Sequence, residues 1–325
     1  MDGGQPETRT GGRRQREDPP GRTGKSGHSR RALLAAAAFA LAGGGVVGAG
    51  AIWRMSGSGS DDGSGSSPAS GTATKPTPSP TPDYLAAVRQ RVEAHVQATK
   101  GRIAVAVQDR VTGSALTVGT QRFQTASIVK ADILAAVLWH AQQDNTKISS
   151  TDRERARKSI TQSDNDATTA LYNRIGGKPG LTEANRAFGM KETTAAESWG
   201  RAQTTAADQI RLLTAVTADD GPLDETSRDF LFDLMSQVEK DQDWGITAAA
   251  TSATTESYVK NGWDQLAADG GRWEINSIGR LVEPGHDWLI AVLSSRHTSM
   301  DAGIRMVEDV AKYTVGELRK IPSGS

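Results

Sequence analysis

The sequence contains no cysteine among its 325 residues. This absence excludes disulfides, thiolate zinc sites, iron–sulfur clusters and cysteine nucleophiles, so packing must stabilise the fold. The 38 lysines and arginines balance 38 aspartates and glutamates, and a net charge of zero gives no indication of a nucleic-acid partner. The chain also has no metal-ligand spacing and no phosphate-binding loop, so we expect no cofactor and no metal.

The N-terminal part of the chain does not have the composition of a globular domain. Residues 1–31 are rich in glycine and arginine, with eight basic and four acidic residues, and we expect a disordered tail. Residues 32–53 form 22 uncharged residues, which is long enough to cross a bilayer as a helix. Arg30 and Arg31 precede this stretch, so the positive-inside rule places the tail in the cytoplasm and the later residues outside.

Two alternatives to a permanent membrane anchor remain open. The stretch is compatible with a cleaved Sec-type signal, because Ala49-Gly50-Ala51 is a small-residue cleavage site, and "SRRALL" contains the paired arginines of a twin-arginine signal. All three readings export the remainder of the chain, either held at the cell membrane or secreted. Residues 56–82 are first Gly/Ser-rich and then Pro/Thr/Ser-rich, which is typical of a flexible linker.

The pattern of a folded domain begins at residue 83 and continues to 325. Helical spacing of apolar residues predicts a first helix, and a mostly helical centre runs from about Lys130 to Gln242. Alternating and apolar runs separated by turn residues predict five strands. The helices are expected at 84–98 and about 300–318, and the strands at 102–109, 114–119, 256–263, 272–282 and 287–295.

This order of elements predicts an α+β fold. Hairpin-like connections favour an antiparallel five-stranded sheet, with the terminal helices on one face. The central helices, about residues 131–244, then form an inserted all-helical lobe. The insertion divides the sheet in the sequence but need not divide it in space.

A serine and a lysine three residues apart, Ser127 and Lys130, open the helical centre. The pattern alone carries little information, because Ser257 and Lys260 repeat it. Residues three apart share a face on a helix and lie on opposite faces of a strand, so only the first pair can act together. The alternative interpretation is that Ser127 caps the helix and Lys130 is solvated. The apolar run "IVKADILAAVLWHA" instead indicates a buried helix, and burial would lower the pKa of the lysine, as a lysine base requires.

Two further motifs contain candidate catalytic or binding residues. "TQSDNDATTALY" displays Ser163 and Asn165 where one helix gives way to another, although Ser, Asp and Asn are also the preferred helix caps. In "YVKNGW", Lys260 stands near the end of a predicted strand before a glycine, and the alternative is an edge-strand lysine followed by a turn.

The order of the three motifs resembles the penicillin-recognising serine hydrolases, and class A β-lactamases most closely. S-x-x-K opens the lobe, S-D-N lies inside it, and K-x-G follows on a strand. Two weaker matches, "GGKPGLTEANRAFGM" at 176–190 and "TTAADQIRLL" at 204–213, extend the resemblance, which covers about residues 83–321.

The resemblance implies a role for each matched residue. Ser127 is the acylated nucleophile, and Lys130 accepts its proton directly or through water. Ser163 relays a proton to the departing nitrogen, and Asn165 binds the amide of the substrate side chain and helps to fix Lys130. Lys260 provides positive potential for the substrate carboxylate.

The rest of the third motif is expected to line the substrate. Asn261, Gly262 and Trp263 follow Lys260 on the same strand, and the backbone N–H groups of Ser127 and Trp263 form the implied oxyanion hole. The family usually has Thr or Ser in place of Asn261, and a small residue in place of the indole of Trp263.

The resemblance is incomplete at the step that releases the product. The β-lactamases of the family carry a glutamate in a Glu-x-x-Leu-Asn setting, and this pattern does not occur between Met190 and Thr204. Glu197 lies nearby, about two residues from the matching position, with a loop carboxylate as the alternative interpretation. Ser127 and Ser163 are 36 residues apart, which implies a trimmed lobe and a more open site.

The sequence therefore predicts an exported serine hydrolase that forms an acyl-enzyme with β-lactams at Ser127 and hydrolyses them slowly. A D-Ala-D-Ala peptidase or wall-remodelling enzyme and a non-catalytic wall-binding or sensor domain are the alternatives. The expected partners are a β-lactam or a peptidoglycan stem peptide, with membrane contact only through residues 32–53 if they are uncleaved, and the expected state is a monomer.

Overall fold

A computed structural model describes residues 83–322 of the protein. The predicted tail at 1–31, membrane-spanning stretch at 32–53 and linker at 56–82 lie outside the described residues. Within 83–322, no helix combines the length and the apolar character needed to cross a bilayer.

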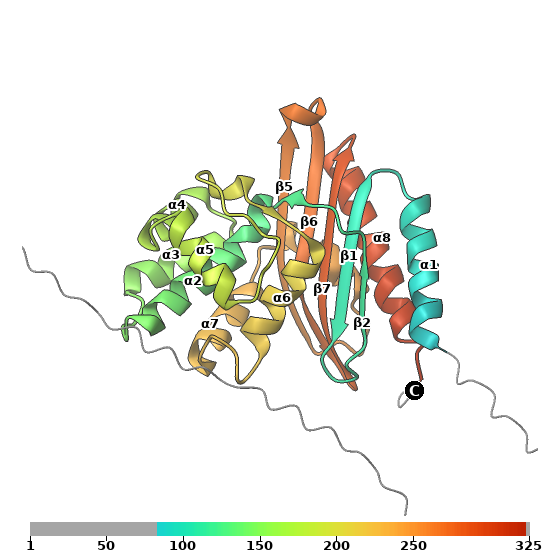
Figure 1. The fold of residues 1–325 in the computed structure, drawn as a ribbon, viewed down its shortest axis with the longest axis horizontal. Coiled ribbons are helices and arrows are strands. Elements are labelled where there is room, and N and C mark those ends of the chain that lie inside the picture. Colours follow the sequence, from blue (N-terminus) through green and yellow to red (C-terminus); the bar gives the residue numbers. More distant parts are fainter. Residues whose placement is uncertain (1–82, 323–325) are drawn as a thin grey trace, which may run out of the picture. The chain divides into compact units, whose positions relative to one another are not determined.

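A five-stranded antiparallel sheet forms the centre of the described domain (Figure 1). Its strand order is β2-β1-β7-β6-β5, so β2 and β5 are the two edges. Both halves of the sequence contribute to one sheet, and the predicted sheet is confirmed. The strands are β1 (Arg102–Asp109), β2 (Ala115–Val118), β5 (Glu256–Leu266), β6 (Arg272–Glu283) and β7 (His286–His297).

The two terminal helices cover one face of the sheet, as the sequence predicts (Figure 1). They are α1 (Tyr84–Ala98) and α8 (Met300–Leu318). Val92 of α1 and Val310 of α8 are fully buried in the same apolar cluster as Val105 and Ile290 of the sheet. Burying such side chains supplies roughly 1.5–3 kcal/mol each and fixes this layer.

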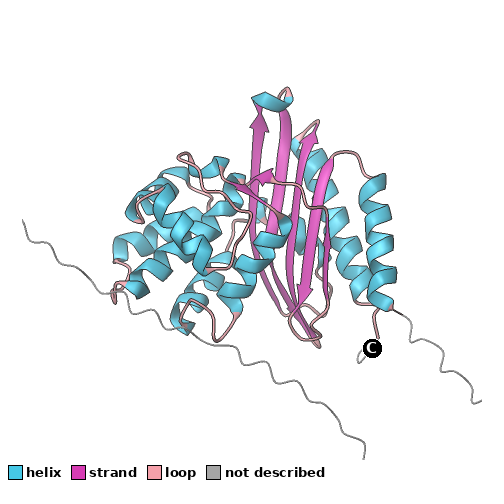
Figure 2. Ribbon diagram, in the orientation of Figure 1, coloured by secondary structure: helices cyan, strands magenta, loops and turns pink. Residues whose placement is uncertain are grey.

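The other face of the sheet carries the helical lobe (Figure 2). Its core joins Ile133 and Leu134 of the first lobe helix to Ile278 and Leu289 of the sheet. The lobe helices are α2 (Val129–Gln143), α3 (Ser150–Thr161), α4 (Asn165–Arg174), α5 (Lys178–Ala187), α6 (Ala206–Thr217) and α7 (Glu225–Met235). Short 3₁₀ helices lie at Ala126–Ile128, Trp199–Arg201, Lys240–Gln242, Gly245–Ala249 and Ala267–Asp269.

Side-chain caps define where many of these helices begin. An oxygen of each capping side chain accepts a hydrogen bond from a backbone N–H group three residues further on, which satisfies a donor that the helix leaves open. The caps are Asp83, Ser149, Asp164, Thr205, Asp224 and Ser299.

Two features of the fold differ from the sequence-based expectation. A two-stranded sheet pairs β3 (Phe123–Gln124) with β4 (Gln203–Thr204), and strands of two residues are too short for an alternating pattern to reveal. Strand β5 also continues to Leu266, pairing with β6 throughout, so no turn follows Gly262. The small sheet ties the loop before α6 to the segment that leads into α2.

Candidate active site

Ser127 lies in the single 3₁₀ turn that leads into α2. The residue at the N-cap of α2 is Ile128, and no side chain caps the helix, so the interpretation of Ser127 as a capping residue is wrong. Ala126, just before it, has a φ of 46°, a conformation that a non-glycine residue rarely adopts. Such strain is characteristic of functional sites, where the surrounding structure holds it in place.

Lys130 is fully buried at the start of α2, which excludes the interpretation of a solvated lysine. Its Nζ donates to the carbonyl oxygen of Ser163 at 2.5 Å, to Ser163 Oγ at 3.0 Å and to Asn165 Oδ1 at 2.8 Å. Burial lowers the pKa of Lys130 to about 8, partly offset by the nearby charge of Asp164. A pKa near the working pH is what a general base requires.

Ser163 faces Lys130 because of the sharp turn between α3 and α4. Its φ is 56°, and this left-handed conformation lets both its carbonyl and its hydroxyl reach the same amine. The capping function falls to the next residue, Asp164, whose Oδ1 accepts from the backbone N–H of Ala167 at 2.7 Å. The "SDN" motif therefore combines a helix cap with two polar groups that face a buried lysine.

Lys260 reaches the same hydroxyl from the edge strand β5. Its Nζ donates to Ser163 Oγ at 3.3 Å and to the carbonyl of Asn261 at 3.1 Å. Lys260 is fully buried, so it is not the exposed edge-strand lysine of the alternative interpretation. Burial, and then the charge of Lys130, lower the pKa of Lys260 to about 7. Two buried amines beside one hydroxyl titrate as a coupled pair, and one of them can be neutral near pH 7.

Ser127 joins this group through its position on the chain. It stands three residues before Lys130 on a helical turn, and its hydroxyl forms no hydrogen bond with the other residues of the 83–322 region. The polar contacts therefore converge on Ser163 Oγ, and Ser127 is connected to them through the turn that leads into Lys130.

Gly262 allows β5 to pass close to the nucleophile turn. A Cβ at this position would lie 2.7 Å from the backbone nitrogens of Ser127 and Ile128, and 2.9 Å from the carbonyl of Thr125. Asn276 of β6 holds the same segment from the sheet, because its amide donates to the carbonyls of Gln124 and Thr125 at 2.9 and 3.2 Å. The glycine is therefore a close-approach residue.

Asn261 and Trp263 alternate with Lys260 and Gly262 along β5, and their side chains lie elsewhere. The buried amide of Asn261 donates to the carbonyls of Gln242 and Trp244 at 2.7 and 2.9 Å. The indole of Trp263 packs in the cluster beneath α8, 6.0 Å from the ring of Trp244. The structure does not bring these two side chains to Ser163, which leaves only their backbone groups for the site.

Glu197 also lies apart from the candidate residues. Its side chain is 86% exposed, and its nearest ionic partner is Lys178, at 3.9 Å. Trp199, two residues further on, takes the position beside the buried amine, with Lys130 Nζ 5.0 Å from the centre of its ring. No motif pointed to Trp199, because a single indole in a loop matches no pattern.

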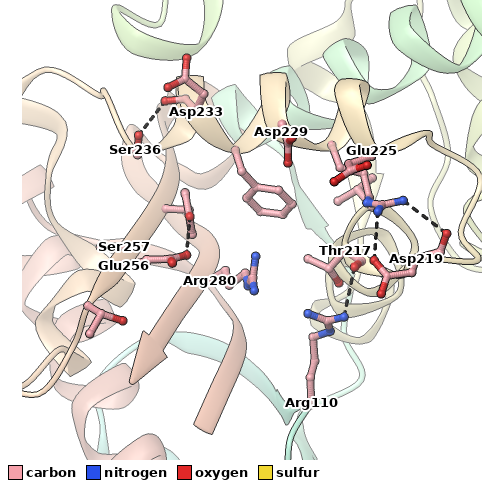
Figure 3. A pocket seen from close by; sticks show the side chains of 15 residues that line it. Arg110, Thr217, Asp219, Glu225, Asp229, Asp233, Ser236, Glu256, Ser257 and Arg280 are labelled. Carbon is pink, nitrogen blue, oxygen red and sulfur yellow. Dashed lines mark hydrogen bonds and ion pairs between the residues drawn. The ribbon is translucent and has the colours of Figure 1, made fainter. Parts of the chain in front are cut away.

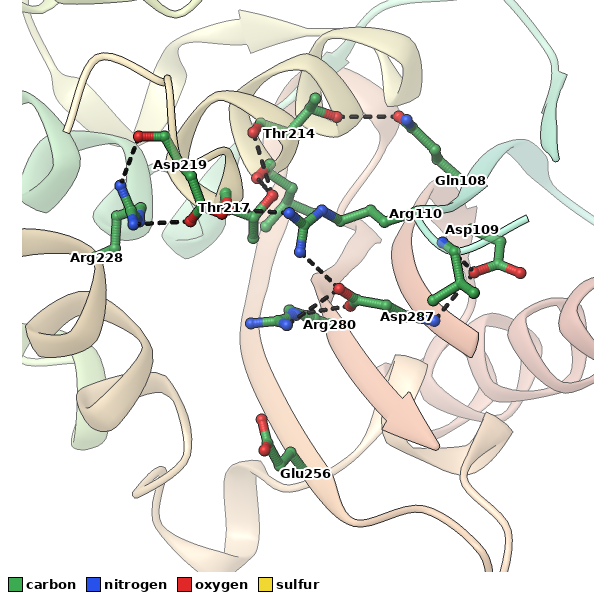
Figure 4. A network of polar contacts seen from close by, with 12 residues as sticks. Gln108, Asp109, Arg110, Thr214, Thr217, Asp219, Arg228, Glu256, Arg280 and Asp287 are labelled. Carbon is green, nitrogen blue, oxygen red and sulfur yellow. Dashed lines mark hydrogen bonds and ion pairs between the residues drawn. The ribbon is translucent and has the colours of Figure 1, made fainter. Parts of the chain in front are cut away.

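A cavity of about 700 Å³ is lined by none of the candidate residues (Figure 3). Ser257 lines it, whereas the amine of Lys260 bonds Ser163, so the second S-x-x-K pair is separated as predicted. Its arginines are already neutralised. Asp287 accepts from Arg280 and Arg110 at 2.6–3.1 Å, and Asp219 accepts from Arg228 at 3.0 Å (Figure 4).

The sheet, the inserted lobe and the Ser-Lys-Ser-Lys arrangement define the class of penicillin-recognising serine hydrolases. A family model described as the β-lactamase enzyme family matches residues 149–317, more than half of the chain, and the protein belongs to this family. The match includes Ser163 and Lys260 and begins after Ser127 and Lys130. No curated protein sequence gives a significant match.

Solved structures show the same fold. PBP-A is 20% identical, with 73% of this chain and 97% of that chain covered and a TM-score of 0.64. The extended-spectrum β-lactamase TLA-1 is 19% identical, covered over 73% and 100%, with a TM-score of 0.65. A class A β-lactamase from Bacteroides cellulosilyticus is 17% identical, covered over 73% and 99%, with a TM-score of 0.63.

Proposed function

We propose that this protein is an exported serine hydrolase that β-lactams acylate at Ser127. The observation that carries the proposal is the hydroxyl of Ser163 placed between the buried amines of Lys130 and Lys260, at 3.0 and 3.3 Å. Membership of the β-lactamase family supports a β-lactam as the substrate. The uncharged stretch at 32–53 and the linker at 56–82 support export, either membrane-held or secreted.

In the proposed acylation, these groups pass protons to one another in a defined order. The neutral amine of Lys130 takes the proton of Ser127 Oγ, and this oxygen attacks the lactam carbonyl. The backbone N–H groups of Ser127 and Trp263 stabilise the oxyanion. The ring C–N bond then breaks, and the nitrogen receives a proton from Ser163, which Lys130 replaces. Lys260, while charged, attracts the substrate carboxylate.

Asn165 has two tasks in this scheme. Its Oδ1 accepts from Lys130 at 2.8 Å, which orients the amine, and its NH₂ group remains for the amide of the substrate side chain. Asn165 is exposed and accepts a hydrogen bond from the buried Lys130, so this asparagine connects the interior of the site to solvent.

A D-Ala-D-Ala peptidase or wall-remodelling activity on a stem peptide is the second candidate. Two observations favour it: the exposed position of Glu197 and the similarity of the fold to PBP-A, a mutant of which was solved as an acyl-enzyme with penicillin G. In this case the penicillin imitates the peptide and stays bound as an ester. A domain that only binds the wall or senses ligands would carry the same fold without acylation.

Intact-mass measurement after incubation with a fluorescent penicillin tests the proposal. A mass increase of one penicillin that disappears in Ser127→Ala supports acylation at this residue. Ser257→Ala is the matched control, because it removes the serine of the second S-x-x-K pair and should retain the adduct. Hydrolysis of the free penicillin in the same mixture supports a lactamase, and a stable adduct supports a slow acyl-enzyme. Neither adduct nor hydrolysis leaves a wall-binding or sensor domain.

A further inference from the structure

The indole of Trp199 spans the gap between Lys130 and helix α4. Its ring centre lies 5.0 Å from Lys130 Nζ, and its Nε1–H donates to Thr169 Oγ1 at 3.1 Å. Thr169 lies one turn after Asn165, the residue that accepts a hydrogen bond from the same lysine. The indole is partly buried against the lobe core. Lys130 therefore has polar acceptors on one side and an aromatic ring on another.

The loop that carries Trp199 is fixed at several points. Asp208 accepts from the backbone N–H groups of Lys191 and Glu192 at 3.0 and 2.7 Å, and Tyr172 donates its hydroxyl to the carbonyl of Ala196 at 2.7 Å. These bonds hold the part of the loop that precedes Trp199.

The part of the loop that follows Trp199 is attached to the nucleophile segment. The backbone N–H of Thr125 donates to the carbonyl of Ala202 at 2.8 Å, and β3 pairs with β4 directly before Ser127. The position of the indole is thus coupled to the position of the nucleophile.

Hydrolysis of an ester on Ser127 needs a water molecule and a group that accepts its proton. The water oxygen bonds to the ester carbonyl carbon, its proton passes to the base, and the bond from that carbon to Ser127 Oγ breaks as the oxygen regains a proton. Lys130 and any carboxylate beside it are the candidate bases. Among residues 83–322, however, Lys130 Nζ is hydrogen-bonded only to Ser163 and Asn165. The nearby carboxylate of Asp164 accepts no hydrogen bond from this amine and caps α4 instead.

We infer that Trp199 covers one face of Lys130, keeps hydrolytic water away from that face, and so prolongs the life of the acyl-enzyme. An indole face carries no basic lone pair, and its apolar surface excludes water. The inference rests on the proposed acylation of Ser127 and specifies its outcome: a penicillin remains bound as an ester. Trp199 acts through Lys130 and is a positioning residue.

The test is the decay of a purified adduct after removal of free penicillin, followed by intact mass in the protein and three variants. Trp199→Glu supplies a carboxylate beside Lys130, and we expect decay about 100-fold faster. Trp199→Ala opens the face to water without adding a base, and we expect roughly tenfold faster decay through Lys130 alone. Trp199→Phe keeps an apolar face but loses the bond to Thr169, so we expect decay about twofold faster, well short of the alanine variant. Adduct formation is measured in parallel, because Lys130 is also the proposed base of acylation, and lifetimes are compared among the variants that acylate.

A pH profile separates this role from a purely structural one. In Trp199→Ala, decay should accelerate as pH rises through the titration of Lys130, because only the neutral amine accepts a proton; with Trp199 in place, burial holds the pKa of this lysine at about 8. Unchanged lifetimes in both Trp199→Ala and Trp199→Glu would overturn the inference, as would a Trp199→Phe adduct that decays as fast as the alanine variant. Thr169→Val provides a test if the larger changes prevent folding: loss of its bond to the indole should shorten the lifetime. If the unmodified protein forms no adduct, the proposed function fails instead.

Discussion

Lys130 Nζ lies 3.0 Å from Ser163 Oγ, although 33 residues separate the two along the chain. The contact brings together the first turn of α2 and the turn between α3 and α4. Lys130 is not a solvated lysine, because it is fully buried. Ser163 is not the cap of α4, because Asp164 caps this helix. Placing an amine in the interior costs free energy, which indicates that this lysine serves more than stability.

Lys130→Met tests whether the buried amine is the base. Methionine keeps most of the length of the side chain but accepts no proton, so we expect adduct formation to slow by at least about 100-fold. The melting temperature should remain the same or rise, because a desolvated amine has been removed. Stopped-flow fluorescence with the labelled penicillin measures the rate, and Lys147→Met, at an exposed lysine, is the control. A Lys130→Met variant that is acylated normally would assign the base elsewhere.

Gly262→Ala tests the close approach between β5 and the nucleophile turn. The new Cβ would lie 2.7 Å from the nitrogens of Ser127 and Ile128, so the strand or the turn must shift. We expect a loss of roughly 1–3 kcal/mol in the free energy of unfolding and a marked loss of acylation. Urea denaturation and adduct formation measure the two effects. Gly316→Ala is the matched control, since nothing lies within 4 Å of its added Cβ; equal behaviour of both variants would contradict the packing argument.

Asn261→Leu separates a structural role from substrate binding. The amide of Asn261 donates to the carbonyls of Gln242 and Trp244, and its loss leaves buried acceptors without partners. We expect the free energy of unfolding to fall by roughly 1–3 kcal/mol, with the acylation rate of the folded protein little changed. Thermal melts and acylation rates at low temperature measure this, with exposed Asn173→Leu as the control. Weaker penicillin binding at unchanged stability would instead restore the predicted binding role.

Asp132 gives the protein a pH-dependent stability that is independent of the candidate site. Burial, with a smaller contribution from the charge of Asp208, raises its pKa from 3.8 to about 8, while the amide of Asn185, 2.8 and 3.2 Å from its oxygens, opposes the shift. Between pH 4 and 8 the folded protein therefore holds a proton that the unfolded chain has lost, and Asp132 reduces stability as pH rises. Asp132→Asn removes this titration.

The gain in melting temperature of Asp132→Asn should therefore grow from pH 5 to pH 8. Other groups titrate equally in both proteins and cancel in the difference. Exposed Asp229→Asn should show no such trend. A gain that is constant across this range would mean that Asp132 is already ionised in the folded protein.

The sequence alone predicted the elements whose residues follow a repeated local pattern. The strand alternation and helical spacing that flank the lobe predicted the sheet and both terminal helices, and the run after Ser127 predicted the burial of Lys130. Partners that depend on backbone path could not be predicted. The left-handed φ of Ser163, the short pairing of β3 with β4 and the position of Trp199 over Lys130 are set by tertiary packing.

The side-chain partners of the third motif depend on the backbone path in the same way. The pattern in "YVKNGW" could not distinguish which side chains face the lobe. Strand alternation in the folded sheet sends Lys260 toward Ser163 and sends the amide of Asn261 toward the 242–244 segment. The family resemblance implied a substrate contact for both.

Peptide mapping of the penicillin adduct tests the central claim most directly. Trypsin cleaves after arginine and lysine, so it places three serines in three different peptides: Ser127 in 123–130, Ser163 in 159–174 and Ser257 in 241–260. Acylation of the candidate nucleophile predicts that the label is found in the peptide "FQTASIVK" alone, and that Ser127→Ala removes it. A label on either of the other two peptides, or no label on a folded protein, would contradict the account.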